Sequence, residues 1–400
     1  MTSILVLLVL LSVATLASRP AALSGLLDRV AAPLLIALGI SLGPAGLGTL
    51  ASGLIDALKP ALAVGVTWLG VLIGLRAGSH DFSAVPQAAD APGSAQSGSA
   101  RAAIIVVLST LASVLLAMAA MAVPQHLGLR DGDHMPLLAG AALILGGALI
   151  GSPPVNEESR AELAMRGHLV DAGDLIAGAC AVVALAVLPT WSTLSPVASA
   201  IVVVGSGIIM ALVQRLLGGS ASGDAATRTI ALLGVVAVVA GILHDAQLPS
   251  AVAGIVAGVV LGKTELGQRL REALSPTERP ARIVVVFLIG AVVPLSLVAL
   301  LVGALLAVTQ LIVRVIATSW AVGHRPDARA TAAGLSSSAV PLVISASYAL
   351  AGLPEGELLL ATAAAAVVIT DVLAAAITTV TLVASRRPGS TPPTIVGAPT

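Results

Sequence analysis

Three aspartates stand in otherwise apolar stretches of this sequence, where a carboxylate could do chemistry. Asp171 and Asp174 lie at the start of one apolar stretch, and Asp371 lies about half-way along the last one. Their spacing places the first two side chains on one face of a helix. Two carboxylates so close raise each other's proton affinity and bring a titration toward the physiological range. Such a pair could hold either a proton or a metal cation, which cation/proton exchange requires.

Each of these charged residues also has a plainer interpretation. Asp171 and Asp174 could be the N-cap and first-turn acids of a helix that begins there, in contact with cytoplasmic water. Asp371 could pair with Thr370 and have a structural role only. Arg314 could extend to the lipid headgroups, or it could provide the counter-charge for Asp174.

Two further stretches combine proline with serine. Ser152, Pro153 and Pro154 end one Gly-rich apolar segment, and Ser337 and Pro341 lie within another. Proline removes a backbone donor, so helices broken here would expose unpaired backbone groups. In hydrocarbon such groups are tolerated where they line a cavity, so we expect the two breaks to coordinate substrate near the membrane midplane. The alternative is that Pro153 and Pro154 only close a helix at the cytoplasmic surface.

The composition bounds the class of protein that could carry these residues. The chain has 400 residues, of which 57% are hydrophobic and 10% charged, and its mean hydropathy is +1.05. This is too little polar surface for a water-soluble globule, so we predict an integral, all-α membrane protein. The net charge of zero argues against a nucleic-acid partner. No histidine pair or phosphate-binding glycine loop favours an enzyme, a cofactor or a metal beyond a transported cation, and the lone Cys180 is expected to pack in the interior.

Proline, glycine and charge clusters divide the chain into about thirteen spans. A long stretch at 281–320 is divided near Pro294 because proline ends or kinks a helix. With the N-terminus outside, eighteen of the twenty Lys and Arg residues fall on cytoplasmic connections, and only Lys59 and Arg130 fall on the other side. This asymmetry predicts a cytoplasmic C-terminus. The predicted spans are 3–17, 30–47, 60–76, 102–123, 136–152, 168–188, 195–217, 228–243, 248–262, 281–295, 297–320, 330–351 and 357–384.

Segments of the two halves resemble each other, which indicates an internal repeat. The segment 34–48 matches 250–262, 66–75 matches 285–294, and 140–154 matches 332–345. The odd offset in the predicted topology makes the two repeats inverted, and the proline-bearing pair predicts one broken helix in each repeat.

Four motifs occur in the order found in one transporter family. They are LGISLGPAGLG, VTWLGVLIGLRA, IGSPPVNEESRAELAMRG, and AGILHDAQLPSAVAGIVAGVVLG followed by ERPARIVVVFLIGA. Together they resemble the membrane domain of the monovalent cation/proton antiporter superfamily, of the sodium/hydrogen exchanger or potassium-efflux type. The resemblance implies a homodimer with a dimerisation domain, a mobile core of crossed broken helices, and a cation-binding aspartate in the helix after SPP. An ungapped alignment places Ala181 at that aspartate, whereas a deletion places Asp174 there.

The predicted spans, the local composition and the resemblance together divide the chain into six regions. They are the dimerisation-side helices of the first repeat (1–77), a flexible cytoplasmic linker (78–101), the first-repeat core with a break near 151–154 (102–190), scaffold and core helices of the second repeat (191–323), its break near 336–341 with the final span (324–386), and a disordered tail (387–400).

The leading hypothesis is a secondary transporter of the cell (inner) membrane that exchanges Na⁺ or K⁺ for protons by alternating access. Asp174, Asp171 and Asp371 would bind the ion or proton, and Arg314 would balance charge. Membrane lipid and a second copy of the chain are the expected partners. Two alternatives remain, a transport-inactive membrane sensor or scaffold and a sodium-coupled carrier of an organic anion.

Overall fold

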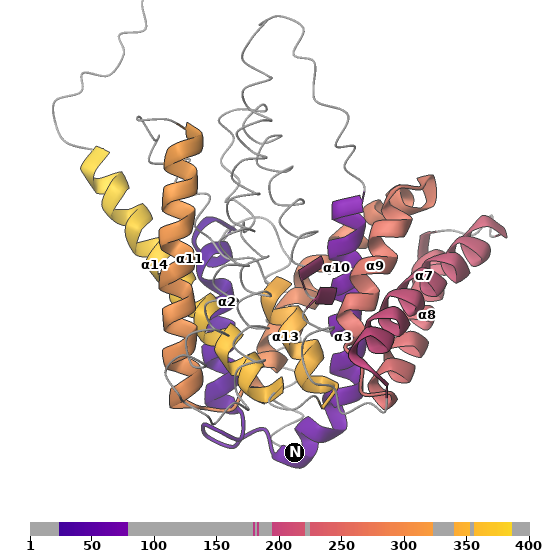
Figure 1. Ribbon diagram of the computed structural model, residues 1–400, viewed down its shortest axis with the longest axis horizontal. Helices are drawn as coiled ribbons and strands as arrows, with labels where there is room; N and C mark the ends of the chain where they lie inside the picture. Colours follow the sequence, from indigo (N-terminus) through magenta and orange to yellow (C-terminus); the bar gives the residue numbers. More distant parts are fainter. Residues whose placement is uncertain are drawn as a thin grey trace, which may run out of the picture.

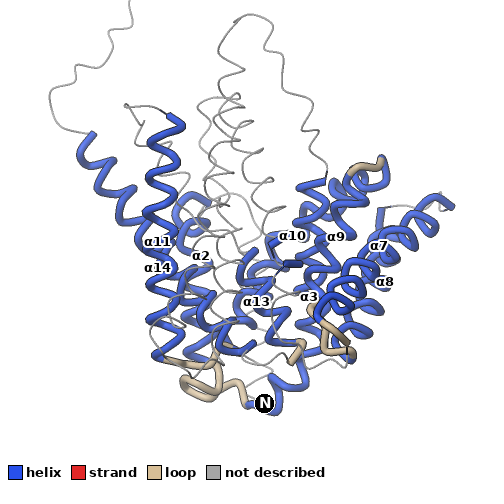
Figure 2. Tube along the Cα trace, in the orientation of Figure 1, coloured by secondary structure: helices blue, strands red, loops and turns tan. Residues whose placement is uncertain are grey.

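Helices form all the regular structure in the residues that the computed structural model describes, which are 24–78, 179–180, 182–183, 194–220, 225–322, 340–352 and 356–385 (Figures 1 and 2). The helices are α2 (Ser24–Leu42), α3 (Ser52–Gly78), α7 (Pro196–Ser220), α8 (Ala225–Asp245), α9 (Ser250–Gly262), α10 (Glu265–Val292), α11 (Leu297–Val322), α13 (Val340–Leu350) and α14 (Gly356–Ser385).

Several of these helices have the length and composition of membrane spans. Within the described ranges, four segments qualify on both counts, namely Ser52–Gly78, Pro196–Leu217, Ala226–Asp245 and Gly356–Leu373. Shorter apolar segments occur in α2, α9, α10, α11 and α13. Long hydrophobic side chains on α7, α8 and α11 are exposed, as expected for helices that face lipid. The prediction of an all-α integral membrane protein is confirmed.

The predicted helix boundaries agree best where proline coincides with the end of a span. α10 ends at Val292 and α11 begins at Leu297, so the division near Pro294 is confirmed. α3 differs, because it begins at Ser52 and continues through Pro60 rather than starting there. Asp56 and Pro60 are exposed at this end of the helix. Water outside the hydrocarbon can satisfy the carbonyl group that proline leaves without a donor, so the helix continues.

α10 also begins earlier than predicted, at Glu265 rather than near residue 281. The Thr264 hydroxyl accepts a hydrogen bond from the Gly267 N–H at 3.1 Å, which caps the helix. Leu270 and Leu274 follow four residues apart and are fully buried, so the charged first part of α10 is an amphipathic helix rather than a loop.

α3 and α9 make the most extensive contact between described helices, and glycine permits it. A Cβ atom built on Gly78 would lie 2.5 Å from the Val259 carbonyl oxygen, and one on Gly262 would lie 2.8 Å from the Leu75 carbonyl oxygen. The two backbones therefore touch directly, and the contacts ascend along both helices, so α3 and α9 run parallel (Figure 1). The glycines that meet are Gly70, Gly74 and Gly78 on α3 and Gly254, Gly258 and Gly262 on α9.

α2 and α10 meet in the same way. A Cβ atom on Gly43 would lie 2.6 Å from the Ala291 carbonyl oxygen, and one on Gly290 would lie 2.7 Å from the Ile36 carbonyl oxygen. Residues 43–51 connect α2 to α3 in a short turn, which reverses the chain direction. The two glycine-mediated pairs, α3 with α9 and α2 with α10, form the part of the core on which α7, α8, α13 and α14 pack, and α11 packs on α14.

α13 occupies the centre of the molecule. It contacts α3, α9, α10 and α14, and nearly all of its residues are buried. The Ser347 hydroxyl accepts a hydrogen bond from the Ala251 N–H at 2.9 Å, which satisfies a backbone donor at the first turn of α9. This contact fixes the C-terminal part of α13 against the N-terminus of α9.

We predict that Gly258→Ala destabilises the protein, because its new methyl group would collide with the α3 backbone at Val71 and Leu75. Overpacking of this kind costs about 1–3 kcal/mol. Thermal unfolding of the purified protein in detergent measures the effect. Gly234→Ala in α8 is the matched control, since nothing lies within 4 Å of its added methyl group. Equal unfolding temperatures for the two variants would contradict the close contact.

Candidate functional site

Most of the predicted ion-binding residues lie outside the described residues. The predictions for these positions therefore stay predictions, and they concern Asp171, Asp174, Ser152, Pro153, Pro154 and Ser337. The alternative ion position, Ala181, is also outside them. Its neighbour Cys180 is buried, unbonded to another cysteine, and belongs to one apolar cluster with Val340 and Ile344 of α13. The prediction that Cys180 packs in the interior is confirmed.

Pro341 is the second residue of α13 and is buried between Val340 and Leu342. The first turn of a helix tolerates proline because its N–H groups have no partner within the helix. Pro341 thus lies at the end of α13 that follows residues 336–340, the region in which the sequence predicts a break.

Asp371 and Arg314 lie on two helices that contact each other. The contact between α14 and α11 is close at Gly303, where an added Cβ atom would lie 2.7 Å from the Thr362 carbonyl oxygen. Both helices rise side by side in Figure 1. At 1.5 Å per residue, Arg314 and Asp371 lie about 16 and 14 Å beyond this contact, at a similar height. Asp371 is partly buried, and it follows the buried residue Thr370.

Three buried hydroxyl groups on α13 and α14 were not predicted as site residues. Ser345, Thr362 and Thr370 are at most 1% exposed, and their hydroxyl oxygens have no hydrogen-bond partner. The turn after α13 contains Gly352 with φ +67°, and Gly356 at the start of α14 packs against the Tyr348 carbonyl group. The chain therefore reverses, which places Ser345 and Thr362 at the same level of an antiparallel hairpin.

An unpaired buried hydroxyl costs about 1–3 kcal/mol in an apolar interior. The three groups on one hairpin are therefore candidates for contact with a ligand or water. Ser347, two residues after Ser345 in α13, differs because its hydroxyl accepts a hydrogen bond from the α9 backbone. A sequence signal existed, since serine and threonine recur in these apolar segments, but most such residues bond their own backbone as Thr67 does.

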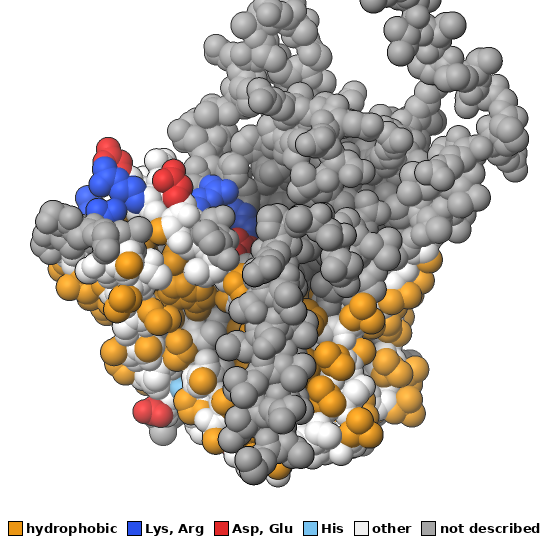
Figure 3. Space-filling view, turned by 180° about the vertical axis from the view of Figure 1, so that it is seen from behind, with side chains coloured by type: hydrophobic (Ala, Val, Ile, Leu, Met, Phe, Trp, Pro, Cys, Tyr) orange, Lys and Arg blue, Asp and Glu red, His pale blue; other side chains and the backbone are white. Residues whose placement is uncertain are grey.

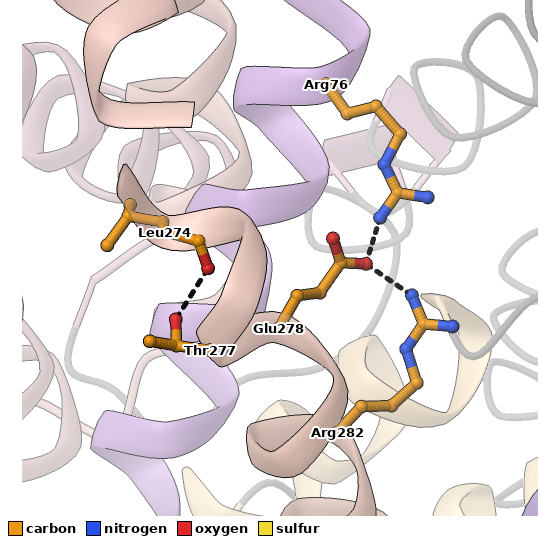
Figure 4. Close-up of polar contacts among 5 residues, drawn as sticks. All are labelled: Arg76, Leu274, Thr277, Glu278 and Arg282. Atoms are coloured by element: carbon orange, nitrogen blue, oxygen red, sulfur yellow. Dashed lines mark hydrogen bonds and ion pairs between the residues drawn. The ribbon is translucent and has the colours of Figure 1, made fainter. Parts of the chain in front are cut away.

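An ion cluster joins the C-terminal end of α3 to α10 (Figure 4). The guanidinium groups of Arg76 and Arg282 both donate to one carboxylate oxygen of Glu278, and the Arg282 bond measures 2.6 Å. The Thr277 hydroxyl donates to the Leu274 carbonyl group at 2.7 Å, within the same turns of α10. One carboxylate oxygen thus accepts hydrogen bonds from guanidinium groups on two different helices. The sequence does not predict this cluster, because Glu278 lies between the predicted spans 248–262 and 281–295.

Metal-binding geometry is absent from the part of the chain that the structure describes. No group of three or more His, Cys, Asp or Glu side chains there could hold a metal ion.

Comparison with known proteins identifies the fold. No protein-family model and no curated protein matches the sequence. A structure of the sodium proton antiporter MjNhaP1 from Methanocaldococcus jannaschii at pH 8 matches with a TM-score of 0.58 and 14% identity, covering 94% of this chain and 98% of that chain. A second MjNhaP1 structure, from an electron-microscopy map, matches with a TM-score of 0.52 and 14% identity, covering 89% and 92%. The chain therefore shares the overall fold of these two solved structures.

We predict that Glu278→Gln destabilises the protein by about 1–2 kcal/mol, because two neighbouring guanidinium groups lose their shared counter-charge in a partly buried position. Thermal unfolding at low and high salt measures the effect, which should decrease at high salt. Glu272→Gln, at an exposed position of the same helix, should leave the unfolding temperature nearly unchanged. A larger loss for Glu272→Gln would show that the cluster does not hold α3 against α10.

Proposed function

We propose that this chain is a secondary transporter that exchanges a monovalent cation, Na⁺ or K⁺, for protons by alternating access. The observation that supports it most is the fold shared with a sodium proton antiporter over nearly the whole length of both chains. The sequence adds the paired carboxylates Asp171 and Asp174, which the same proposal uses as the site of exchange. The protein would act as a homodimer in the inner membrane, with its N-terminus outside and its C-terminus in the cytoplasm.

Competition for one carboxylate site gives the proposed mechanism. Asp174, assisted by Asp171, binds either the proton or the cation. Both ions neutralise the same carboxylate charge, so the binding of one disfavours the binding of the other. The helix breaks at Ser152–Pro154 and at Ser337–Pro341 would supply backbone and hydroxyl oxygens for the cation. Asp371 and Arg314, at a similar height on contacting helices, would balance the charge that remains in the membrane interior.

The packing of the helices supports two inverted repeats within this transporter. The contact of Gly43 with Ala291 has a counterpart in the contact of Gly258 with Val71. The first segment thus corresponds to α9, and α3 corresponds to α10, each pair with its own shift in residue number. With the same two shifts, the contact of Gly290 with Ile36 corresponds to that of Gly70 with Ala251. The corresponding helices, α2 with α9 and α3 with α10, run in opposite directions (Figure 1). These are the segments that the sequence pairs as repeats. We infer that an inverted repeat relates the two glycine-mediated pairs.

The exchange proposal predicts that everted vesicles carrying the protein release accumulated protons when Na⁺ or K⁺ is added, and that Asp174→Asn abolishes this release. A pH-sensitive dye inside the vesicles measures it. Asp245→Asn, at the exposed end of α8, is the control and should retain exchange. If the wild type moves no protons with either cation, the sensor or scaffold alternative replaces exchange. If Asp174→Asn remains fully active, the carboxylate assignment is wrong.

We also propose that the unpaired hydroxyl oxygens of Ser345 and Thr362 line the path of the cation. Removing them in Ser345→Ala with Thr362→Val should raise the cation concentration for half-maximal exchange by roughly five- to tenfold, the equivalent of about one hydrogen bond. The unfolding temperature should not fall, because neither group has a partner to lose. Ser347→Ala should do the reverse, lowering stability through the lost Ala251 contact. An unchanged concentration dependence in the double variant would contradict this role.

A further inference from the structure

Two sets of charged side chains lie at opposite ends of α3, about one membrane thickness apart. Lys59 pairs with Asp56 at 2.9 Å at one end, and Arg76 pairs with Glu278 at the other. The seventeen intervening steps of helix span about 26 Å, close to the roughly 30 Å of a hydrocarbon core. The residues between them are mostly apolar and buried. The two ion pairs therefore mark the two levels of the lipid headgroups.

The charge at these two levels is unequal. Figure 3 shows Lys, Arg, Asp and Glu side chains gathered at one end of the molecule, above a largely apolar flank. Among the charged side chains that the structure describes, the end of the helices that carries Lys59 has one basic residue and three acids, namely Asp56, Asp245 and Glu357. The opposite end has seven basic residues against three acids. The basic residues are Arg76, Arg215, Arg228, Lys263, Arg269, Arg271 and Arg282, and the acids are Glu265, Glu272 and Glu278.

The first part of α10 presents this positive charge along the headgroup level. Leu270 and Leu274 are fully buried against the protein, so this amphipathic helix does not insert its apolar face into lipid. Arg269 and Arg271 within α10 are exposed, as is Lys263 just before it, and Arg269 lies 3.9 Å from the exposed Glu265. We name the residues Arg76, Lys263, Arg269, Arg271 and Arg282 the basic end patch.

Glu278 gives the patch its fixed centre. Its carboxylate binds two guanidinium groups from different helices and neutralises one of the two charges. The side chain of Arg282 is 39% exposed, so donors not directed at Glu278 can reach a ligand. A guanidinium group carries five N–H donors in a planar arrangement that matches phosphate oxygens. The carboxylate holds the guanidinium groups in place and so lowers the entropic cost of binding.

We propose that the basic end patch binds the headgroup phosphate of an anionic phospholipid, with Arg282 at the centre of the site. The phosphate lies at the level of the patch in the surrounding bilayer, and a basic surface there attracts anionic lipid. This inference depends on the membrane fold and the ion cluster, and it holds whether or not the chain exchanges cations.

Native mass spectrometry of the purified protein tests the proposal with an equal mixture of phosphatidylglycerol and phosphatidylcholine. We expect phosphatidylglycerol to be retained about tenfold more often by the wild type, and Arg282→Gln to lose most of this preference. Because Arg282→Gln also removes an ion pair, the double variant Arg269→Gln with Arg271→Gln provides a second test at exposed positions, and it should lower the preference at least threefold. Lys59→Gln, at the other end of α3, is the control and should keep it.

Three results would overturn the proposal. The wild type could show no preference, both patch variants could keep the full preference, or Lys59→Gln could lose as much as they do. Addition of inorganic phosphate separates the possible sources of the ligand. If phosphate at millimolar concentration displaces phosphatidylglycerol completely, the site binds a soluble anion rather than a lipid.

Discussion

The hydrocarbon interior of the membrane allows few unpaired polar groups, and each feature of this structure responds to that constraint. Helices satisfy their own backbone groups, and they associate through direct backbone contact because lipid provides no hydrophobic drive between them. The glycines of α3 and α9, and those of α2 with α10, allow this approach. Most of the charged side chains that the structure describes lie near the ends of the helices, and along α3 the two charged positions Lys59 and Arg76 are about 26 Å apart.

Because unpaired polar groups are costly in the interior, each buried polar side chain there needs a partner or a function. Ser347 caps α9 and Thr67 bonds its own helix, so both are explained by structure alone. Ser345, Thr362 and Thr370 have no such partner, and they lie on the hairpin that begins near Pro341 and continues to Asp371. An ion that crosses the membrane needs oxygen atoms of this kind to replace its water. The glycine-mediated scaffold and the proposed ion path are therefore separate parts of the same core, joined where α13 contacts α9.

The sequence predicts the helix boundaries well where the length of an apolar stretch and the position of a proline indicate the same helix end. The spans at 228–243 and 297–320 lie within α8 and α11, and Pro294 separates two helices. The prediction was wrong at residues 265–280, because their charges resemble those of a loop, while Thr264 and the spaced leucines build an amphipathic helix. The ion cluster around Glu278 was missed for the same reason, since it requires knowing that α3 and α10 meet. Asp171 and Asp174 lie outside the described residues, so their assignment still depends on spacing and resemblance.

Proton release on cation binding tests the central claim most directly, because one carboxylate site cannot hold both ions. Purified protein in a weakly buffered detergent solution, below the pH at which the site deprotonates, is titrated with NaCl or KCl against a choline chloride control. The account predicts that the bound cation displaces protons in proportion to site occupancy, and that cation affinity falls about tenfold for each unit of lower pH. Cation binding without proton release, or with an affinity independent of pH, would contradict exchange at a shared carboxylate.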